Sequence, residues 1–491
     1  MRVNYQVNVT PQLRILSDDQ IEQIVWAALE VLQTTGARVY QEQALALLRE
    51  AGCVIEDENL VHLPAALVEN SIKSAPSRIV LGGRDRSKRL WLEKNRIYYG
   101  TGSDCPFLLD PYTGERRRYT FNDVYNAAKI ADALPHIDFF MSLGLVSDVP
   151  IGTYDRHQFL AMLKGTTKPL VITAVDREGL QDQWEMACAV IGGKDEWRKL
   201  PLFALYIEPS SPLSNSKEAV EKLLFAAEND IPTIYTPCPI GGATAPATLA
   251  GVLVQALAEC LTGITIAQLQ RRGAPMIMGG VTSIFDMQTT ILSYGAPELA
   301  LMSAAFTDIA KYLRLPMFST AGCSDAKVLD QQAAIESAIS IAVAGLSGAN
   351  LIHDVGYLES ALDGSYEMLV MSNEIISMVK RILRGVVVDA DHLALDVIER
   401  VGPGGHYLMD EHTLKYFRDE FWMPELLDRR NYDAWMEEGG KTLGNRVHDK
   451  VLDLIERYEP VPLAPEIERK LRLIIASADE RHEAEEQVKL V

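Results

Sequence analysis

Eight short apolar runs recur at regular intervals through the middle of the chain, and helical patterns separate most of them. The runs occupy residues 97–102, 139–146, 170–174, 202–207, 233–237, 276–280, 317–320 and 351–355. Strands that alternate with helices predict a parallel sheet, and eight repeats over about 260 residues match a (β/α)8 TIM barrel. A doubly wound open sheet is the alternative, but no G-x-G-x-x-G turn follows the first run.

The segments on either side of these runs have a different pattern. Residues 1–95 mix helical patterns with short strands and turns, which predicts an N-terminal α+β cap. Residues 96–375 form the predicted catalytic barrel. Residues 376–491 are charged and largely helical, which predicts a C-terminal helical extension with its polar faces in solvent or at a subunit contact. These long helices favour a homo-oligomer.

The charge and the cysteines exclude several classes of protein. A formal charge of -20 disfavours a nucleic-acid binder, which needs a basic face. The six cysteines contain no C-x-x-C pair and the N-terminus has no apolar signal core, so we expect a reduced, cytoplasmic protein. No uninterrupted apolar run approaches the roughly 20 residues of a spanning helix, so we expect no membrane segment.

The richest polar turn lies at residues 318–336, F-S-T-A-G-C-S-D-A-K-V-L-D-Q-Q-A-A-I-E, where the seventh run leads into a helix. Active sites of such barrels are built from the loops after the strands. The other candidates at these positions are Tyr98, Tyr99, Ser103, Asp104, Cys105, Glu208, Cys238, Gly241, Gly242, Thr244, Gly279, Gly280, Thr282, His353, Asp354, Tyr357 and Glu359.

Several of these residues have more than one interpretation. A zinc site or a thiol nucleophile could use the set Cys105, Cys238, Cys323 and His353, although free cysteines are commonly small buried residues. His353 and Asp354 could be an acid/base pair, a substrate-polarising pair or a structural hydrogen bond. The Gly-rich turn at 239–246 could admit an anion at a helix N-terminus, or could simply be tight.

Four motifs together resemble the trimethylamine methyltransferase superfamily, in its non-pyrrolysine branch of glycine-betaine and other quaternary-amine enzymes. They are G-G-A-T-A-P-A-T-L-A-G at 241–251, Y-G-A-P-E at 294–298, G-C-S-D-A-K-V-L-D-Q-Q-A at 322–333 and H-D-V-G-Y at 353–357. The resemblance covers nearly the whole chain. Its motifs do not distinguish one substrate from another.

The resemblance implies a barrel enzyme that moves a methyl group from a quaternary amine to Co(I) of a corrinoid. Glycine betaine is the first expectation, with dimethylglycine released; proline betaine, carnitine and γ-butyrobetaine are the alternatives. The corrinoid pattern D-x-H-x-x-G is absent, since the segments at Asp155 and Asp410 lack its Gly. We therefore expect the chain itself to bind no cofactor and no metal, and a separate corrinoid protein to carry the cobalamin.

The same resemblance assigns roles of placement and water exclusion, with no catalytic nucleophile or acid in this chain. The aromatic cage expected for the trimethylammonium group consists of Tyr98, Tyr99 and Tyr357. The substrate carboxylate is expected to meet His353 and the backbone N–H groups near Gly241 and Gly242. The residues expected to shape the turn or face the corrinoid are Asp325, Lys327 and Gln331.

Three alternatives stay open. Lys327 could instead form a structural ion pair with Asp325 or Asp330. The chain could be a zinc-dependent barrel methyltransferase or lyase. It could also be a betaine-binding module without catalysis.

Overall fold

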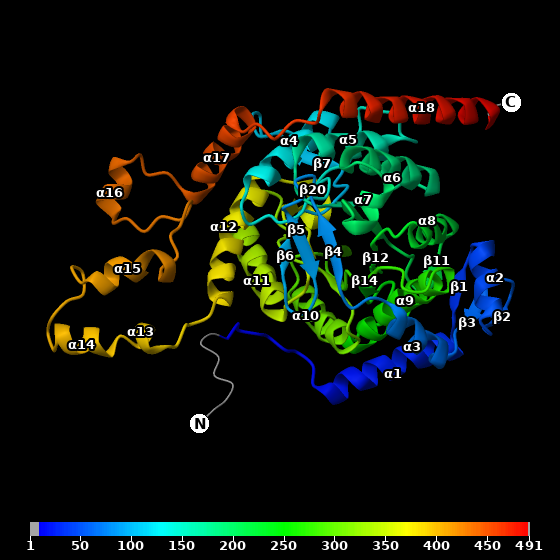
Figure 1. Ribbon diagram of the computed structural model, residues 1–491, viewed down its shortest axis with the longest axis horizontal. Helices are drawn as coiled ribbons and strands as arrows, with labels where there is room; N and C mark the ends of the chain where they lie inside the picture. The colour runs from blue at the N-terminus through cyan, green and yellow to red at the C-terminus, as the bar shows by residue number, and fades with distance from the viewer. Residues whose placement is uncertain (1–8, 490–491) are drawn as a thin grey trace.

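A curled, parallel seven-stranded sheet lies at the centre of the protein (Figure 1). The structure is a computed structural model that describes residues 9–489, with side chains for residues 9–484. In spatial order the strands are β6 (Tyr98–Tyr99), β18 (Leu351–His353), β17 (Met317–Thr320), β14 (Met276–Gly279), β12 (Thr233–Tyr235), β10 (Phe203–Ile207) and β9 (Leu170–Ile172). The α/β class and the parallel sheet are confirmed.

The two edges of this sheet meet through the second apolar run. Phe139 bridges Gly100, which follows β6, and Phe140 bridges Leu170 of β9, in both cases in parallel. A Cβ on Gly100 would lie 2.5 Å from the Phe139 ring, so glycine is required for this close approach. The sheet therefore curls round through residues 139–140 instead of ending in two open edges.

Helices cover the outer face of the sheet. They are α4 (Phe121–Ala133), α5 (Tyr154–Gly165), α6 (Arg177–Ile191), α7 (Lys194–Lys199), α8 (Lys217–Glu228), α9 (Leu249–Gln270), α10 (Pro297–Tyr312), α11 (Gln331–Ser347) and α12 (Tyr366–Leu383). The ends of α11 follow from sequence: Asp330 accepts from the N–H groups of Gln332 and Ala333, and Gly348 ends the helix with φ 76°.

Lys168 fastens α4 to the sheet. Its Nζ donates to the carbonyl oxygens of Ala131, Leu134 and Ile137 at 2.5, 2.7 and 2.6 Å, which satisfies groups that the end of a helix leaves open. The side chain is 7% exposed, and burial lowers its pKa to about 8. The contact fixes the start of β9 against the end of α4 and the turn that follows α4.

A hairpin closes one end of the curled sheet. It consists of β4 (Ile79–Gly82) and β5 (Arg89–Leu92), and its apolar side chains form one buried cluster with inward-facing residues of the strands. The strand residues in that cluster are Phe139, Met141, Val171, Ala204, Ile234, Ile277, Phe318 and Leu351. Because apolar side chains fill this end, polar groups can gather only toward the C-terminal ends of the strands.

The N-terminal segment adds helices and a small sheet. Its elements are α1 (Asp18–Thr34), β1 (Ala37–Val39), α2 (Glu42–Glu50), β2 (Val54–Glu56), β3 (Leu60–His62) and α3 (Ala65–Ser74). β1 also pairs with β11 (Ser214–Asn215), so the small sheet takes a strand from the central part of the chain. α1, α2 and α3 pack on α9. α9 is long and apolar enough to span a membrane, but 72% of its apolar window is buried inside the fold.

Short strands and one 3-10 turn surround the C-terminal ends of the sheet. They are β7 (Phe107–Leu109), β8 (Arg116–Arg118), β13 (Ile240–Gly241), β15 (Ser283–Asp286), β16 (Ile291–Ser293), β19 (Tyr357–Leu358), η1 (Glu359–Ala361) and β20 (Asp363–Gly364). β13, β15 and β16 form one small sheet, and β19, β20, β7 and β8 form another. These pieces are the walls around the polar end of the central sheet.

The C-terminal part is helical, as expected. It contains α13 (Ala390–Leu393), α14 (Leu395–Val401), α15 (Glu411–Glu420), α16 (Tyr432–Glu437), α17 (Leu443–Arg457) and α18 (Pro465–Lys489). α17 packs on α12 and α4, and α18 packs on α5 and α6. In Figure 1, α13 to α16 lie apart from the rest of the molecule.

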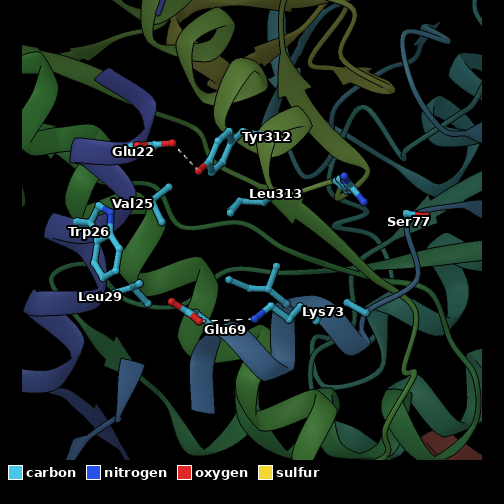
Figure 2. A pocket seen from close by; sticks show the side chains of 12 residues that line it. Glu22, Val25, Trp26, Leu29, Glu69, Lys73, Ser77, Tyr312 and Leu313 are labelled. Carbon is cyan, nitrogen blue, oxygen red and sulfur yellow. Dashed lines mark hydrogen bonds and ion pairs between the residues drawn. The ribbon is translucent and has the colours of Figure 1, made fainter. Parts of the chain in front are cut away.

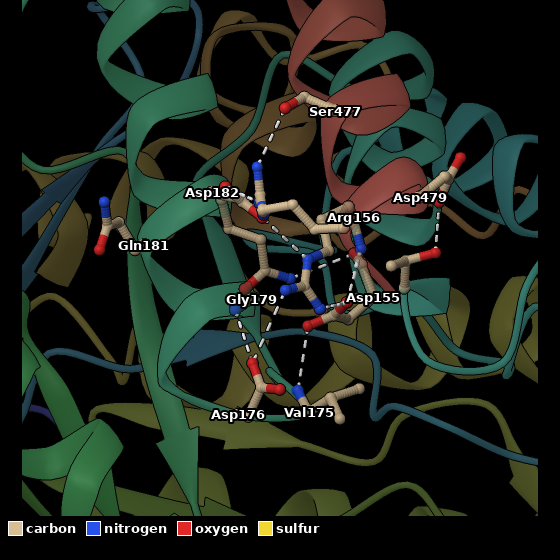
Figure 3. A network of polar contacts seen from close by, with 12 residues as sticks. Asp155, Arg156, Val175, Asp176, Gly179, Gln181, Asp182, Ser477 and Asp479 are labelled. Atoms are coloured by element: carbon tan, nitrogen blue, oxygen red, sulfur yellow. Dashed lines mark hydrogen bonds and ion pairs between the residues drawn. The ribbon is translucent and has the colours of Figure 1, made fainter. Parts of the chain in front are cut away.

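An ionic network joins α18 to the loop after β9 (Figure 3). The Arg156 guanidinium, 3% exposed, pairs with Asp155 at 2.8 Å and with Asp182 at 3.2 Å. Asp182 also pairs with Arg481 of α18 at 2.8 Å, and Asp155 accepts from the N–H of Val175 at 3.0 Å. The segment at Asp155 is therefore buried structure.

Candidate functional site

The C-terminal ends of the strands place polar and aromatic side chains directly above the apolar interior. Side chains alternate along a strand, so each residue two positions beyond an interior residue faces the same side. Ala204, Ile234, Phe318 and Leu351 belong to the interior cluster. The next inward residues on those four strands are Tyr206, Thr236, Thr320 and His353, and Glu208 follows Tyr206.

Glu208 follows the end of β10; its side chain retains exposed surface, and desolvation raises its pKa. The group formed by Tyr206, Glu208, Tyr294, His353 and Asp354 at these strand ends is here called the recess. The Tyr206 hydroxyl donates to Glu208 Oε2 at 3.1 Å. Tyr294 faces the same groups, since burial raises its pKa and the charges of Asp354, Cys238 and Glu208 add to that rise.

His353 and Asp354 form a buried pair at the floor of this site. His353 Nδ1 lies 2.9 Å from the Ser319 carbonyl oxygen, and Nε2 lies 3.2 Å from Asp354 Oδ1. Burial lowers the pKa of His353 to about 3 and raises the pKa of Asp354 well above its usual value. A neutral imidazole that donates to Ser319 and accepts from a protonated Asp354 fits both shifts.

Tyr357 forms part of the wall. Its hydroxyl donates to the Ser103 carbonyl oxygen at 2.6 Å, and its ring meets Tyr294 edge-on with centroids 6.3 Å apart. A Cβ on Gly102 would lie 2.1 Å from the Tyr357 hydroxyl, so glycine makes room for this ring. Asp104 follows nearby: Gln158 donates to it at 2.9 Å, and burial raises its pKa.

Several buried hydroxyl groups at these strand ends lack a hydrogen-bond partner within the described part of the chain. They belong to Thr236, Thr282, Ser319 and Thr320. The carboxyl oxygen Oδ2 of Asp354 also lacks a hydrogen-bond partner there. An unsatisfied buried polar group costs about 1–3 kcal/mol. Ser319 points to the opposite face of β17 from Thr320, so the groups of this set on the recess side include those of Thr236, Thr320 and Asp354, which are available to a polar ligand.

The charged groups of the recess are carboxyl groups. Among the described residues, no Lys or Arg appears among the groups that shift the pKa of Glu208 or Asp354. The site therefore combines carboxyl groups and tyrosine rings without a cation of its own.

Tyr98 and Tyr99 lie outside this recess, so their predicted place in an aromatic cage is wrong. The Tyr98 hydroxyl accepts from the N–H of Trp91 at 3.1 Å, which places it at the hairpin end of the sheet. Tyr99 is fully buried, and its hydroxyl donates to the Ile341 carbonyl oxygen of α11. Tyr98 and Tyr99 point to opposite faces because they are adjacent residues of one strand. Both lie several residues before the point at which the chain reaches the mouth.

Gly241 and Gly242 lie in the small sheet beside the mouth. Gly241 pairs with Ile284, and Gly242 has φ 88°. The Gly242 N–H already donates to the Ala245 carbonyl oxygen at 3.0 Å. Both ring nitrogens of His353 are engaged as well. His353 and the Gly242 N–H therefore have little capacity left to donate to a substrate carboxylate, which was their expected role.

The motif at 322–333 lies at the rim of the site and holds neighbouring backbone in place through hydrogen bonds. Asp325 Oδ1 accepts from the N–H groups of Tyr294 and Gly295 at 2.8 and 3.0 Å, which holds Tyr294 in place. Lys327 Nζ donates to the Asp325 backbone carbonyl at 2.8 Å, so neither predicted carboxylate partner is used. Lys327 and Gln331 are exposed at the start of α11.

The cysteines have the character of buried thiols. Burial raises the pKa of Cys105, Cys238 and Cys323, and Cys323 donates to the Tyr294 carbonyl oxygen at 3.4 Å. Within the described residues, no three His, Cys, Asp or Glu side chains are placed as ligands of one metal ion. Raised thiol pKa values disfavour the thiolates that zinc binding requires.

Sequence reasoning missed the central members of the recess. Tyr206 was not singled out, Glu208 was only one strand-end candidate, and Tyr294 was noted only within a motif. The Y-I-E alternation at 206–208 was the available signal, because it places both polar side chains on one face.

A second hollow, of ≈ 550 Å³, lies on the outside between α1, α3 and the end of α10 (Figure 2). Three of its charged groups have partners: the Tyr312 hydroxyl donates to Glu22 at 3.2 Å, and Glu69 lies 3.6 Å from Lys73. Tyr312 precedes β17, so this hollow is at the opposite end from the recess.

The family model and the curated relatives that match this chain agree on one family. Residues 1–483 match the family model described as trimethylamine methyltransferase (MTTB). The glycine betaine methyltransferase of Desulfitobacterium hafniense strain Y51 is 33% identical over 470 residues, covering 95% of this chain and 97% of that protein. The trimethylamine methyltransferase MttB of D. hafniense strain DSM 10664 / DCB-2 is 32% identical over 467 residues, covering 95% and 94%.

Among solved structures, the monomethylamine methyltransferase MtmB of Methanosarcina barkeri is similar to this chain at 13% identity and a TM-score of 0.48. That match covers 93% of this chain and 97% of that one.

Proposed function

The chain belongs to the trimethylamine methyltransferase family and is a methyltransferase, and we propose that it moves a methyl group from a quaternary amine to a corrinoid on a separate protein. The expected donor is glycine betaine, and the product is dimethylglycine. The similarity to a glycine betaine methyltransferase supports this donor. The observation that carries the proposal is the recess with Glu208 and three tyrosines.

A quaternary ammonium group fits this chemistry. It keeps its positive charge at every pH and has no N–H to donate, so only carboxylates and aromatic faces can recognise it. Glu208 supplies a carboxyl group, and the surrounding rings are Tyr206, Tyr294 and Tyr357. The absence of a cation among the described groups around Glu208 leaves the recess favourable to a positive ligand.

The orphan hydroxyl groups suit the other end of a betaine. Within the described residues, Thr236 and Thr282 carry buried hydroxyl groups without a hydrogen-bond partner, and the Thr320 hydroxyl lies beside Asp354. Each can donate to a carboxylate, which His353 and Gly242 are poorly placed to do. His353 and Asp354 then hold the floor of the site as positioning residues.

The residues of this chain work by placement. When bound over the mouth, a corrinoid would supply Co(I) as the acceptor of the methyl group. The recess holds the ammonium group with one methyl toward the opening and keeps water from the reacting carbon, which can lower the barrier by several kcal/mol. Exposed Lys327 and Gln331 stand at the rim where the partner would approach.

The architecture supports this arrangement. In this proposal the sheet is the wall of a (β/α)8 barrel, with residues 139–140 as its eighth strand; the two bridges at Gly100 and Leu170 support it. The division into residues 1–95, 96–375 and 376–491 stays a prediction.

A donor panel tests the function. The purified chain is mixed with Co(I) cobalamin and glycine betaine, proline betaine, carnitine, γ-butyrobetaine or trimethylamine, and methylcobalamin is followed by absorbance. We expect transfer from a quaternary amine and none from trimethylamine. Transfer from trimethylamine alone would overturn the donor assignment.

A further inference from the structure

A buried carboxyl group lies behind the recess, on α9. Glu259 is 1% exposed and does not belong to the recess itself. A charged side chain is rarely buried unless it is paired or hydrogen-bonded, because burial removes it from water. Within the described part of the chain, no Lys or Arg contributes to the pKa of Glu259. The hydrogen bonds of Glu259 must therefore account for its burial.

These hydrogen bonds connect α9 to residues 208–213, here called the Glu208 loop. The Ser211 hydroxyl donates to Glu259 Oε2 at 2.6 Å, and the Leu213 N–H donates to Oε1 at 2.9 Å. Leu213 has φ 51°, in the left-handed region that few residues other than glycine adopt. Such a conformation persists only where the surroundings hold it. Glu259 thus holds the loop in one shape a few residues after Glu208.

The Glu208 loop is also attached at both ends. β10 precedes it, and Ser210 and Ser214 exchange backbone hydrogen bonds at 2.9 and 3.0 Å, which closes this part of the chain into a tight turn. Asn215, 1% exposed, accepts from the Tyr235 hydroxyl at 2.6 Å. Both ends of the loop are therefore held by the body of the protein, and Glu259 fixes the part between them.

Glu259 reaches a second loop at the mouth through Gln255. The Gln255 amide donates to Glu259 Oε1 at 2.8 Å and to the Thr244 carbonyl oxygen at 2.8 Å. Thr244 belongs to the Gly-rich turn at 239–246, where its hydroxyl accepts from the N–H of Ile240 at 2.9 Å. One buried carboxyl group therefore links two loops that follow the neighbouring strands β10 and β12.

Each of these partners donates a hydrogen bond to Glu259. The donors are a hydroxyl, a backbone N–H and a side-chain amide. An ionised carboxylate only accepts hydrogen bonds, so this set of donors matches the ionised form. Burial raises the pKa of Glu259, and the three hydrogen bonds oppose that rise. The geometry therefore provides for a negative charge on α9, behind Glu208.

The charge of Glu259 acts on the recess. Burial raises the pKa of Glu208, and the charge of Glu259 adds to the rise. Burial likewise raises the pKa of the Cys238 thiol, and the charges of Glu208, Asp354 and Glu259 add to that rise. Other titratable groups near the two glutamates are Tyr206, Tyr235, Tyr294 and Cys260. None of these side chains supplies a positive charge that would cancel the two carboxylates.

We propose that Glu259 is a positioning residue of the recess, which holds the Glu208 loop in place and strengthens the preference of the recess for a positively charged ligand. This inference rests on the proposed function, in which the donor is a quaternary amine. Glu259 acts through Glu208, because it fixes where that carboxyl group lies and adds a second negative charge behind it. A neutral ligand of the same shape gains nothing from the added charge.

Calorimetry with tetramethylammonium tests the proposal. This probe has the charge and shape of the head group of the donor and lacks a carboxylate. Glu259→Gln keeps the shape of the side chain and removes its charge, so it should weaken probe binding roughly 3- to 30-fold, as for residues of one network. In a Glu208→Gln background the same change should cost less than about 2-fold, because the residue through which Glu259 acts has lost its charge.

The pH dependence separates this role from a purely structural one. The charge of Glu259 raises the pKa of Glu208, so Glu259→Gln should lower that pKa. Tetramethylammonium favours the ionised form of Glu208, and its binding should weaken as pH falls through the pKa of this group. The midpoint of that decrease should therefore lie at lower pH in Glu259→Gln than in the wild type. A residue needed only for folding would leave the midpoint unchanged.

Two further variants complete the experiment. Ser211→Ala removes one hydrogen bond between the Glu208 loop and Glu259 and keeps the charge, so it should weaken probe binding by a smaller factor; it serves as the test if Glu259→Gln folds poorly. Glu374→Gln on α12 is the matched control. Glu374 is 3% exposed and accepts from the three backbone N–H groups of residues 425–427 at 3.0, 3.0 and 3.1 Å. Its replacement should lower thermal stability and leave probe binding unchanged.

Several outcomes would overturn the proposal. They are unchanged probe binding in both Glu259→Gln and Ser211→Ala, an equal loss with and without the Glu208 carboxylate, and equal weakening in Glu374→Gln. A wild-type chain that does not bind tetramethylammonium would overturn it even if that chain transfers methyl groups. The donor panel is an independent measurement: a wild-type chain that binds the probe and transfers no methyl group would overturn the proposed function and leave the role of Glu259 in place.

Discussion

Replacing Glu208 by Gln should selectively weaken the binding of a cationic donor. The change removes a negative charge and keeps the shape of the side chain and the hydrogen bond from the Tyr206 hydroxyl. At about 4–5 Å and an effective dielectric constant near 20, a carboxylate and an ammonium group attract by about 3–4 kcal/mol. The cost of keeping a carboxylate desolvated offsets part of this, which leaves about 1.5–3 kcal/mol. We expect roughly 10- to 100-fold weaker binding of glycine betaine.

Calorimetry with two ligands measures this effect. Glycine betaine carries the positive charge, whereas 3,3-dimethylbutyrate has the same shape with carbon in place of nitrogen. The Glu208→Gln variant should lose affinity for glycine betaine and keep or gain affinity for the isostere, which lacks the positive charge and is an anion. Glu50→Gln, at an exposed position in the N-terminal segment, is the matched control and should change neither.

The pH dependence has a defined sign. Burial raises the pKa of Glu208, and a bound cation favours its ionised form, so binding releases a proton wherever the free carboxyl is protonated. Wild-type affinity for glycine betaine should therefore fall as pH falls through that raised pKa, and the Gln variant should be flat. Equal weakening of both ligands, or unchanged betaine binding, would refute the role of Glu208.

Three further predictions follow from the same geometry. Tyr357→Phe removes the 2.6 Å hydrogen bond to the Ser103 carbonyl oxygen and should lower the rate of methyl transfer about 10-fold. Tyr98→Phe, at the hairpin end of the sheet, should leave this rate unchanged. Equal effects of the two variants in steady-state kinetics would contradict the assignment of the site. Lys168→Met removes the hydrogen bonds to the carbonyl oxygens of Ala131 in α4 and of Leu134 and Ile137 after it, and should lower the free energy of unfolding by about 3 kcal/mol in urea titrations, against little change for exposed Lys73→Met. His353 has a folded pKa of about 3, so as pH falls the unfolded chain binds a proton at this residue before the folded chain does. The stability of the fold should therefore decrease as pH falls from 6.5 toward 3. His353→Gln should make stability less dependent on pH over this range, and an unchanged pH dependence in thermal unfolding would contradict the buried neutral imidazole.

The parallel sheet could be predicted because its strands are buried on both faces. Such strands appear in a sequence as continuous apolar runs, and helices between them leave a regular spacing. Seven of the eight runs contain strands of the central sheet, and the run at 139–146 supplies the bridging residues Phe139 and Phe140. The spacing alone could not show that this run pairs through isolated bridges.

The side chains of the site were harder to predict. Tyr98 and Tyr99 are neighbours in the chain, yet one faces the interior and the other faces α11, and neither is at the mouth. Tyr294 reaches the recess through a loop after β16, whose path depends on bonds to Asp325 that no local pattern reveals. The periodicity of apolar residues identifies the strands. It does not show which side chains lie at the mouth, because that depends on tertiary packing.

The β4–β5 hairpin has a consequence for the order of events during turnover. Because its apolar side chains fill one end of the curled sheet, the recess cannot be entered through that end. Under the proposed function, in which an acceptor protein docks over the mouth, the methyl donor enters before that protein docks and the demethylated amine leaves after it departs. Steady-state kinetics should show a compulsory order, with the dissociation of the acceptor protein setting an upper limit on turnover.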